Sequence, residues 1–456
     1  MSMGVKLRRA GYEEVSSMSS LPPGPRSRTL QTVEWLRDPV AMMQKYTERY
    51  GDPFLFNLWA FGPTACTSTP EGIRAIFTAP PAIFASNIRV GAGPLLGENS
   101  IFILDGARHK RQRALMMPAF HGERMQAYGT LMQDIALRHA TAWQPGQAFR
   151  MYDVTRAISL EVIIQAIFGV QAKDRVKLFE ETIFSFISSF TPLIAFLTPL
   201  RAELGGLGPW SRFKQTEARL QQLMVEEIRA RQRALDVPED ILSLLVAARL
   251  EDGSAMTDEE LIDDLKSLIF AGHETVAIAA AWALYFIHRE PHVYRGLQAE
   301  LEPLGDSPDP KDLAQLPYLS AICDEALRLH PSVSGVPRKL KEPFSLQGYD
   351  LPPGAAVFPA ISTAHLNPAV YQDPLSFRPE RFLERKYTPF EYLPFGGGGR
   401  RCIGAAFGLY EMKIVLGSIL ARHRLFLAEN QPVRPVTRTF THAPKGGVKM
   451  IYQGRV

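Results

Sequence analysis

With 456 residues, 46% of them hydrophobic and 21% charged, the chain has the composition of a globular protein with enough apolar material for a large core. A formal net charge of +4 is small for this length, and it indicates neither a nucleic-acid partner nor an anionic membrane. The three cysteines (Cys66, Cys323 and Cys402) have no framework spacing, which argues against a disulfide scaffold and fits a reducing compartment.

The first 20 residues mix basic and acidic side chains with five serines, and they contain no apolar segment of the kind found in a signal peptide. A proline-rich stretch, Leu21-Pro-Pro-Gly-Pro25, follows them. The most apolar later stretch, residues 183–200, is interrupted by two prolines and is a poor candidate for a membrane span. We therefore expect residues 1–20 to be disordered, residues 21–456 to form a single domain, and the protein to be cytoplasmic without a membrane span or a nucleic-acid partner.

Short strand patterns occur early, at Phe54–Trp59 and Thr64–Thr67, and each is bounded by glycine or proline. Helical periodicity dominates from about residue 107 to residue 330, for example in Val154–Phe168 and Leu220–Leu235. The sequence therefore predicts a fold that is mainly α with a minor β part.

One predicted helix is long for a globular protein, since it begins near Thr257 and extends to about His288. Thr257 and Glu260 have the spacing of a capping box, and Asp258 favours the positive end of the helix dipole. The later segment Pro352–Phe395 is rich in proline and turn residues, so we expect a meandering loop region there.

Within the long helix, a glycine, an acid and an alcohol are close together in the run Ala271-Gly-His-Glu-Thr275. Gly272 removes a side chain and would make room for a small ligand such as dioxygen, while Glu274 and Thr275 can relay protons through water. The alternative is a surface carboxylate beside a buried β-branched residue. A His-Glu-x-x-His zinc helix is excluded, because the residue four positions after His273 is Ala277.

A glycine-rich run with a cysteine follows the turn-rich segment: Phe395-Gly-Gly-Gly-Gly-Arg-Arg-Cys402-Ile-Gly404. Four consecutive glycines permit positive φ and a close approach to a flat ligand. Cys402 beside Arg400 and Arg401, with Phe395 as an apolar shield, is placed where a thiolate is favoured, and such a thiolate suits axial ligation of a haem iron. A phosphate-binding loop is excluded because Gly-Lys-Ser/Thr is absent, and an inert buried thiol is the alternative for Cys402.

This run resembles the haem-binding loop of the cytochrome P450 family, in the form Phe-x-x-Gly-x-Arg-x-Cys-x-Gly. Ala271–Thr275 resembles the oxygen-activating groove of the central helix of that family. Glu325-x-x-Arg328 and the segment Pro379-Glu-Arg-Phe382 resemble its Glu-x-x-Arg helix and the partner of that helix. The motifs occur in the expected order, and the resemblance covers essentially the whole chain from Leu21 onward.

The resemblance implies a cytochrome P450 fold that holds haem b (iron protoporphyrin IX) between the long central helix and the cysteine-bearing loop, with Cys402 as the axial ligand of the iron. It implies that Glu274 and Thr275 are catalytic, delivering protons to the distal oxygen. The further haem contacts that it implies are His109, Arg113, Ala271, Gly272, Arg338, Phe395, Arg400 and Gly404. Among these, the four cationic side chains would bind the propionates, and solvated surface cations are the alternative.

Glu325, Arg328 and Arg381 are expected to form a buried structural set that fixes the cysteine loop, since a buried Arg–Glu–Arg set is costly to break. For Glu325 and Arg328, which are three residues apart on a helix, the alternative is a surface ion pair.

The implied activity is that of a monooxygenase, which inserts one oxygen atom of O₂ into a lipophilic small molecule (a fatty acid, terpenoid or polyketide-like compound) and reduces the other to water. Only 456 − 402 = 54 residues follow Cys402, too few for a flavin reductase domain, so a separate ferredoxin or flavodoxin with its reductase is expected to supply electrons. The candidate docking residues for an acidic donor are Arg108, Lys110, Arg111 and Arg113, for which a solvated face is the alternative.

The substrate pocket is less well defined by sequence. The segment Phe179–Pro199 holds five phenylalanines where the family has its mobile access lid, and such a segment suits a lipophilic guest or, equally, a hydrophobic core. Further pocket candidates are Val333, Val336 and Phe440.

Three other functions were weighed against oxygenation. Peroxide-driven members of the family have Arg-Pro in place of the acid–alcohol pair, and members that do not oxygenate usually lack the threonine, so Glu274 and Thr275 argue against both. A haem-binding sensor or carrier needs neither a proton relay nor an apolar lid.

Overall fold

The computed structural model describes residues 21–456 except 60, 121–123, 192–193, 195–200, 202–204, 235–239 and 439–440, so the expectation for residues 1–20 lies outside the described residues. The helices are α1 Arg28–Arg37, α2 Pro39–Tyr50, α3 Pro70–Thr78, α4 Arg89–Leu96, α5 Gly106–Met116, α6 Arg124–Ala140, α7 Met151–Phe168, α8 Lys173–Ser189, α10 Pro209–Arg233, α11 Ile241–Ala247, α12 Asp258–Arg289, α13 Pro291–Leu301, α14 Pro310–Gln315, α15 Pro317–Leu329, α16 Ile361–Ala364, α17 Arg381–Glu384 and α18 Ala405–Arg422. The strands are β1 Phe54–Leu58, β2 Gly62–Thr67, β3 Phe84–Ser86, β4 Ala148–Arg150, β5 Arg338–Leu340, β6 Phe344–Leu346, β7 Tyr349–Leu351, β8 Ala356–Pro359, β9 His423–Leu427, β10 Pro435–Arg438, β11 Thr441–Pro444 and β12 Lys449–Arg455.

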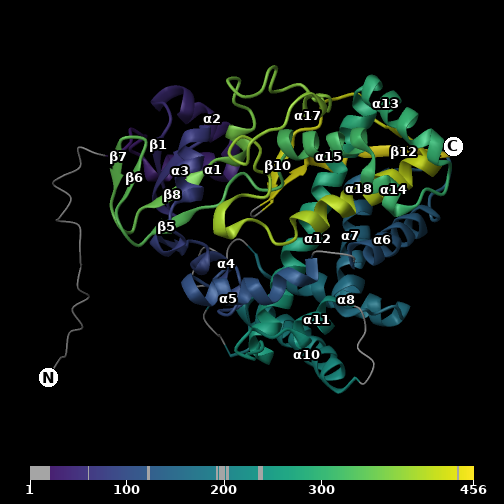
Figure 1. The fold of residues 1–456 in the computed structure, drawn as a ribbon, viewed down its shortest axis with the longest axis horizontal. Coiled ribbons are helices and arrows are strands. Elements are labelled where there is room, and N and C mark those ends of the chain that lie inside the picture. The colour runs from purple at the N-terminus through teal and green to yellow at the C-terminus, as the bar shows by residue number, and fades with distance from the viewer. Residues whose placement is uncertain are drawn as a thin grey trace.

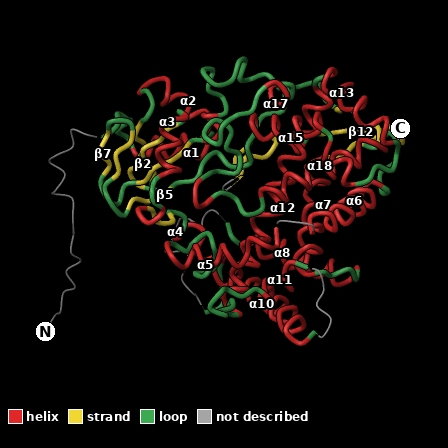
Figure 2. Tube along the Cα trace, in the orientation of Figure 1, coloured by secondary structure: helices red, strands yellow, loops and turns green. Residues whose placement is uncertain are grey.

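Most strands lie at one end of the molecule, whereas β12, of the sheet β4-β12-β9, lies among the helices near the C-terminus (Figures 1 and 2). The five-stranded sheet, in the order β1-β2-β8-β5-β3, lies with α1, α2 and α3 at one end and has its own apolar cores. The remaining helices pack around one large core, which contains residues of α7, α12 and α18. The prediction of a mainly α fold with a minor β part is confirmed.

Helix α12 is the central element of the helical part, packing against α7, α15 and α18 (Figure 1). It begins as predicted, because the Thr257 hydroxyl accepts a hydrogen bond from the Glu260 backbone N–H and the Glu260 carboxylate accepts one from the Thr257 backbone N–H. It ends one residue beyond the predicted His288, just before Pro291 starts α13. Among the described helices it alone is long and apolar enough to cross a membrane, and it is mostly buried inside the protein.

The early strands β1 and β2 lie where they were predicted. The expectation of a loop throughout Pro352–Phe395 was wrong at three points, because β8, α16 and α17 lie within this segment. Residues Ala356–Pro359 form β8, which is buried and pairs in parallel with β2 and antiparallel with β5. This short run does not alternate apolar and polar residues, so the sequence pattern does not identify it as a strand. Only its pairing with neighbouring strands distinguishes it from a turn.

The phenylalanine-rich segment is mainly core where the structure describes it. Phe179 stacks on Phe168 of α7, and Phe186 stacks on Phe213 of α10, so the core alternative holds for these two side chains. Phe190 is also buried, whereas Phe184 is exposed. Phe196 lies outside the described residues.

Candidate functional site

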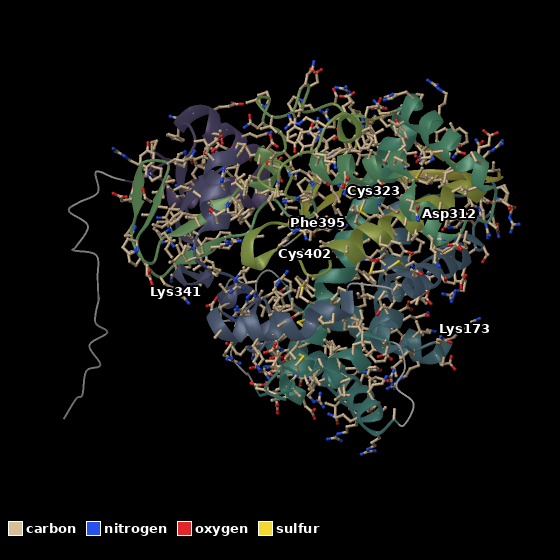
Figure 3. The ribbon with its side chains drawn as sticks, in the orientation of Figure 1. Lys173, Asp312, Cys323, Lys341, Phe395 and Cys402 are labelled. Atoms are coloured by element: carbon tan, nitrogen blue, oxygen red, sulfur yellow. The ribbon has the colours of Figure 1, made fainter. Side chains whose placement is uncertain are left out.

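Cys402 lies near the centre of the molecule, between the strand-rich part and the helical part (Figure 3). Its backbone N–H donates to the Phe395 carbonyl at 3.0 Å and closes the glycine-rich loop. Gly396 and Gly398 have φ of 65° and 64°, so the loop needs the left-handed conformations that glycine supplies. This part of the chain is therefore a tight turn that ends in a fixed cysteine at the start of α18.

Two of the loop glycines serve a different purpose from the one predicted. A Cβ on Gly397 would lie 2.2 Å from the Phe77 ring, and one on Gly398 would lie 2.6 Å from the Phe77 carbonyl oxygen. These glycines therefore admit α3, not a flat ligand. A Cβ on Gly396 or on Gly404, in contrast, would meet nothing within 4 Å, so the loop is open at these two positions.

The Cys402 side chain is partly enclosed by the protein and still keeps an exposed face. It is exposed, yet burial is the largest influence on its thiol and raises the pKa. The exposure and the raised pKa are consistent if many protein atoms surround the side chain while one part of it remains accessible to solvent. Its backbone hydrogen bond with Gly404 and the charges of Arg401 and Arg113 oppose the rise in pKa, so this environment offers partial support to a thiolate.

Four basic side chains from different parts of the chain lie close enough to influence one another: His109, Arg113, Arg338 and Arg400. Burial and the charges of Arg400 and Arg113 lower the pKa of His109 to about 4, and Arg338 contributes in the same direction. Asp105, which accepts from Arg400 Nη2 at 2.6 Å, is the acidic group that counters them at His109. These four basic side chains outnumber the single carboxylate of Asp105, so this region can bind further anionic groups.

Arg338 provides the sharpest test of whether haem fits. Only 7% of this residue is exposed, and burial with the charge of Arg400 lowers its pKa to about 10. Its Nη2 donates to the Gly397 carbonyl at 2.7 Å, but its Nε is buried and has no hydrogen-bond partner among the described residues. A buried unpaired guanidinium N–H is costly, and a carboxylate such as a haem propionate would satisfy it. The solvated-cation alternative is therefore wrong for Arg338.

The Glu325–Arg328–Arg381 set lies behind the cysteine loop. Glu325 Oε2 and Oε1 accept from Arg328 Nε and Nη2 at 2.7 and 2.8 Å, and Oε1 also accepts from Arg381 Nε at 3.0 Å. All three residues are buried, so the surface-pair alternative is wrong. Arg328 further donates to three backbone carbonyls of the meander (His365, Pro374 and Ser376). The set thus ties α15 to the segment that precedes the loop.

On α12, the run Ala271–Thr275 stays helical, with the Thr275 hydroxyl donating to the Ala271 carbonyl at 2.7 Å. The interpretation of Gly272 needs correction, because a Cβ there would lie 2.8 Å from Ile163 Cδ1 of α7. The glycine makes room for a close helix contact, and not for dioxygen.

Glu274 is half-buried, and its carboxylate Oε1 accepts from the Tyr152 hydroxyl of α7 at 3.0 Å. The sequence did not point to Tyr152. Glu411 of α18 was missed as well: it is 1% exposed, and burial raises its pKa to about 8, an effect that Ser159 only partly opposes. An acid within the otherwise apolar pattern of α18 was the available signal.

The remaining candidates lie apart from these groups or outside the description. Val333 is half-buried and Val336 is exposed, both between α15 and β5, while Phe440 lies outside the described residues. Of the basic docking candidates on α5, Arg108 and Lys110 are exposed. Arg111 instead forms an ion pair with Glu260 of α12 at 3.0 Å, so it is not one of the exposed members to which the docking prediction applies.

Comparison with known proteins agrees with this geometry. The family model described as Cytochrome P450 matches residues 21–450. A Mycobacterium tuberculosis protein that carries the name cytochrome P450 135B1 is 33% identical over 447 residues, which cover 95% of this chain and 92% of that protein. Another from the same organism, named 135A1, is 31% identical over 446 residues and covers 96% and 97%. The solved structure of retinoic acid bound cyanobacterial CYP120A1 superposes with a TM-score of 0.83 at 26% identity, covering 95% of this chain and 99% of that one.

The chain therefore belongs to the cytochrome P450 family. It is a haem-thiolate monooxygenase, with iron protoporphyrin IX as its cofactor and with dioxygen and a redox partner implied by the family. The fold predicted from the motifs is confirmed.

Proposed function

We propose that the protein inserts one oxygen atom from O₂ into a lipophilic small molecule, with electrons from a separate ferredoxin or flavodoxin and its reductase, in the cytoplasm. The observation that carries the proposal is the combination of an accessible Cys402 inside the protein with the buried, unpaired Nε of Arg338. Cys402 is a ligand for iron, and Arg338 Nε is a hydrogen-bond donor for a carboxylate. Haem carries both an iron ion and carboxylates.

In this proposal the Cys402 thiolate would hold the haem iron. Arg338 and Arg400, with His109 and Arg113 of α5, hold the propionates, and Phe395 shields the sulfur. Haem, when bound, supplies the activation of dioxygen and the transfer of oxygen to substrate, for which the thiolate ligand favours O–O cleavage. The surrounding chain orients the substrate and excludes water.

Proton delivery is assigned to the acid and the alcohol of α12. Glu274 is half-buried, so its carboxylate exchanges protons with solvent and passes them inward. The Thr275 hydroxyl, anchored on the Ala271 carbonyl, orients the water or dioxygen that receives the proton. Each turnover consumes two protons and two electrons and produces one water and one oxygenated product.

Glu325, Arg328 and Arg381 are assigned a structural role, in which they hold the meander so that the cysteine loop keeps its shape. For the electron donor, the exposed Arg108 and Lys110 support an acidic partner on the α5 side. For the substrate, retinoic acid in the structural relative supports a lipophilic guest.

The first experiment is the absorption spectrum of the purified protein, reduced with dithionite and exposed to carbon monoxide, beside Cys402→Ser prepared in parallel. We expect the long-wavelength Soret band of a thiolate-ligated haem in the wild type and its loss in the variant. A shorter-wavelength band in a carefully handled wild-type sample would contradict thiolate ligation and favour a haem-binding sensor.

The second experiment titrates retinoic acid and dodecanoic acid into the ferric protein and follows the Soret band. A saturable shift with either probe, followed by an oxygenated product with ferredoxin, reductase and NADPH, would support the proposal. Product formed with hydrogen peroxide alone, and none with the electron-transfer chain, would replace it with a peroxide-driven enzyme.

A further inference from the structure

The acid assigned to proton delivery is held by a phenol from a neighbouring helix. The Tyr152 hydroxyl of α7 donates to Glu274 Oε1 at 3.0 Å, and within the described part of the chain no other side chain hydrogen-bonds to that carboxylate. Tyr152 is 1% exposed, whereas Glu274 is half-buried. The carboxylate therefore keeps access to solvent while a buried partner fixes its direction.

A second hydrogen bond joins the same two helices, which run antiparallel, since Ile163 further along α7 lies against Gly272 of α12. The Thr155 hydroxyl of α7 donates to the Ala277 carbonyl of α12 at 2.9 Å. Tyr152 and Thr155 are three residues apart, as are Glu274 and Ala277, so one face of α7 is joined twice to one face of α12. These two hydrogen bonds fix the position of Tyr152 relative to Glu274 along the axis of α12.

Tyr152 is itself fixed from its other side. The Arg438 guanidinium of β10 lies over its ring, 5.0 Å from the ring centre, within the range of a cation–π contact. Burial and the negative charge of Glu274 raise the pKa of Tyr152, so the phenol keeps its proton at neutral pH. It acts as a hydrogen-bond donor and not as a proton source.

Helix geometry by itself does not aim Glu274 at the site of Thr275. Consecutive residues of an α-helix project about 100° apart, so the two side chains leave α12 in different directions. Thr275 is held by its own bond to Ala271 and by the Ser332 hydroxyl, which donates to the Thr275 carbonyl at 2.8 Å. Glu274 needs an external partner, and Tyr152 is that partner.

We infer that Tyr152 is a positioning residue for proton delivery: its hydroxyl holds the Glu274 carboxylate in one orientation on the α7 side of α12. This inference rests on the proposed role of Glu274 in the reaction. It assigns to α7 a task that no motif of the sequence indicates.

The test compares Tyr152→Phe, Glu274→Gln and the double variant in the haem-loaded protein. A matched control is Tyr318→Phe, which removes another phenol–carboxylate hydrogen bond (to Glu380 Oε1, 2.6 Å) away from this site. Each variant must first show the wild-type carbon monoxide spectrum. The assay then measures hydrogen peroxide released per NADPH, with a plant ferredoxin, its reductase and retinoic acid or dodecanoic acid as the probe, whichever gives the larger spectral shift.

We expect Tyr152→Phe to raise peroxide release several-fold, Glu274→Gln to raise it at least as much, and the double variant to equal Glu274→Gln. Tyr318→Phe should match the wild type. If the effects of Tyr152→Phe and Glu274→Gln multiply in the double variant, Tyr152 acts independently of Glu274 and the inference is wrong.

A crystal structure of haem-loaded Tyr152→Phe gives a readout that does not depend on turnover. We expect the Glu274 carboxylate to turn away from the position that it has in the wild type, or to occupy several positions. An unmoved carboxylate would overturn the inference whatever the assay shows. A displaced carboxylate together with a Glu274→Gln variant of normal peroxide release would uphold the positioning by Tyr152 and refute the proposed function of Glu274.

Discussion

The two sides of the proposed haem site are built in opposite ways. Behind the cysteine loop, Glu325 and Arg328 are fully buried, and Arg328 alone donates to one carboxylate and three carbonyls. On the α12 side, Glu274 is half-buried and held by one hydrogen bond. A densely bonded set keeps a ligand loop in one shape, whereas a carboxylate with a single partner remains free to exchange a proton. The side with Glu325 and Arg328 therefore serves stability, and the α12 side with Glu274 serves the reaction.

The largest effect is expected from replacing Cys402, the proposed iron ligand itself. Cys402→Ser should abolish oxygenation and weaken haem retention, because an alcohol is a poor ligand for the iron. Haem content by pyridine haemochrome and product formation measure the two effects. Turnover at the wild-type rate would contradict the assignment of Cys402.

The second prediction breaks the buried set. Glu325→Ala leaves Arg328 and Arg381 as buried unpaired charges, so it should destabilise the folded protein by about 3–5 kcal/mol and lower the yield of haem-loaded protein. Thermal unfolding and haem content measure it. Glu429→Ala is the control, because its pair with Lys449 is exposed and should be worth at most about 1 kcal/mol. If Glu325→Ala and Glu429→Ala reduced stability equally, the structural role of the Glu325–Arg328–Arg381 set would be contradicted.

The third prediction uses pH. Burial raises the pKa of Glu411 from 4.5 to about 8, so between these values the folded protein holds a proton that the unfolded chain has released. Stability therefore falls as pH rises through this window, by about 1.4 kcal/mol per unit at most. Glu411→Gln removes that slope, so its stability relative to the wild type should increase from pH 5 to pH 8.

Unfolding midpoints of wild type and Glu411→Gln at several pH values between 5 and 8 measure this difference. Glu429→Gln, on an exposed side chain, controls for the removal of one carboxyl group. A constant difference between wild type and Glu411→Gln across the window would show that Glu411 is not buried as a neutral acid.

The smallest expected effect on stability, within about 1 kcal/mol, belongs to Thr275→Ala, which removes one hydroxyl bonded to its own helix. Haem binding should be retained, while peroxide released per NADPH should rise several-fold, because the proton relay loses one of its two groups. Thr275→Ser keeps the hydroxyl and should restore coupling. A Thr275→Ala variant as well coupled as the wild type would remove Thr275 from the relay.

Much of the fold could be predicted because it depends on local signals. The start of α12 follows from Thr257 and Glu260, which bond to each other, and β1 and β2 follow from short apolar runs between turn residues. β8 could not be predicted, since Ala356–Pro359 becomes a strand only by pairing with β2 and β5. The glycine assignments failed for the same reason: what Gly272 and Gly397 accommodate is decided by Ile163 and Phe77, which are far away in the chain.

For the site, the sequence by itself determined which groups are present: a cysteine after a glycine turn, an acid–alcohol pair, and arginines at motif spacing. The tertiary structure decided how these groups are used. Among the residues that the structure describes, it left Arg338 Nε buried without a partner, and it paired Arg111 with Glu260 of α12. It also brought Tyr152 to Glu274 across 122 positions. Hydrogen bonds and burial act over a few ångströms between residues that the chain separates widely, so only the folded arrangement reveals them.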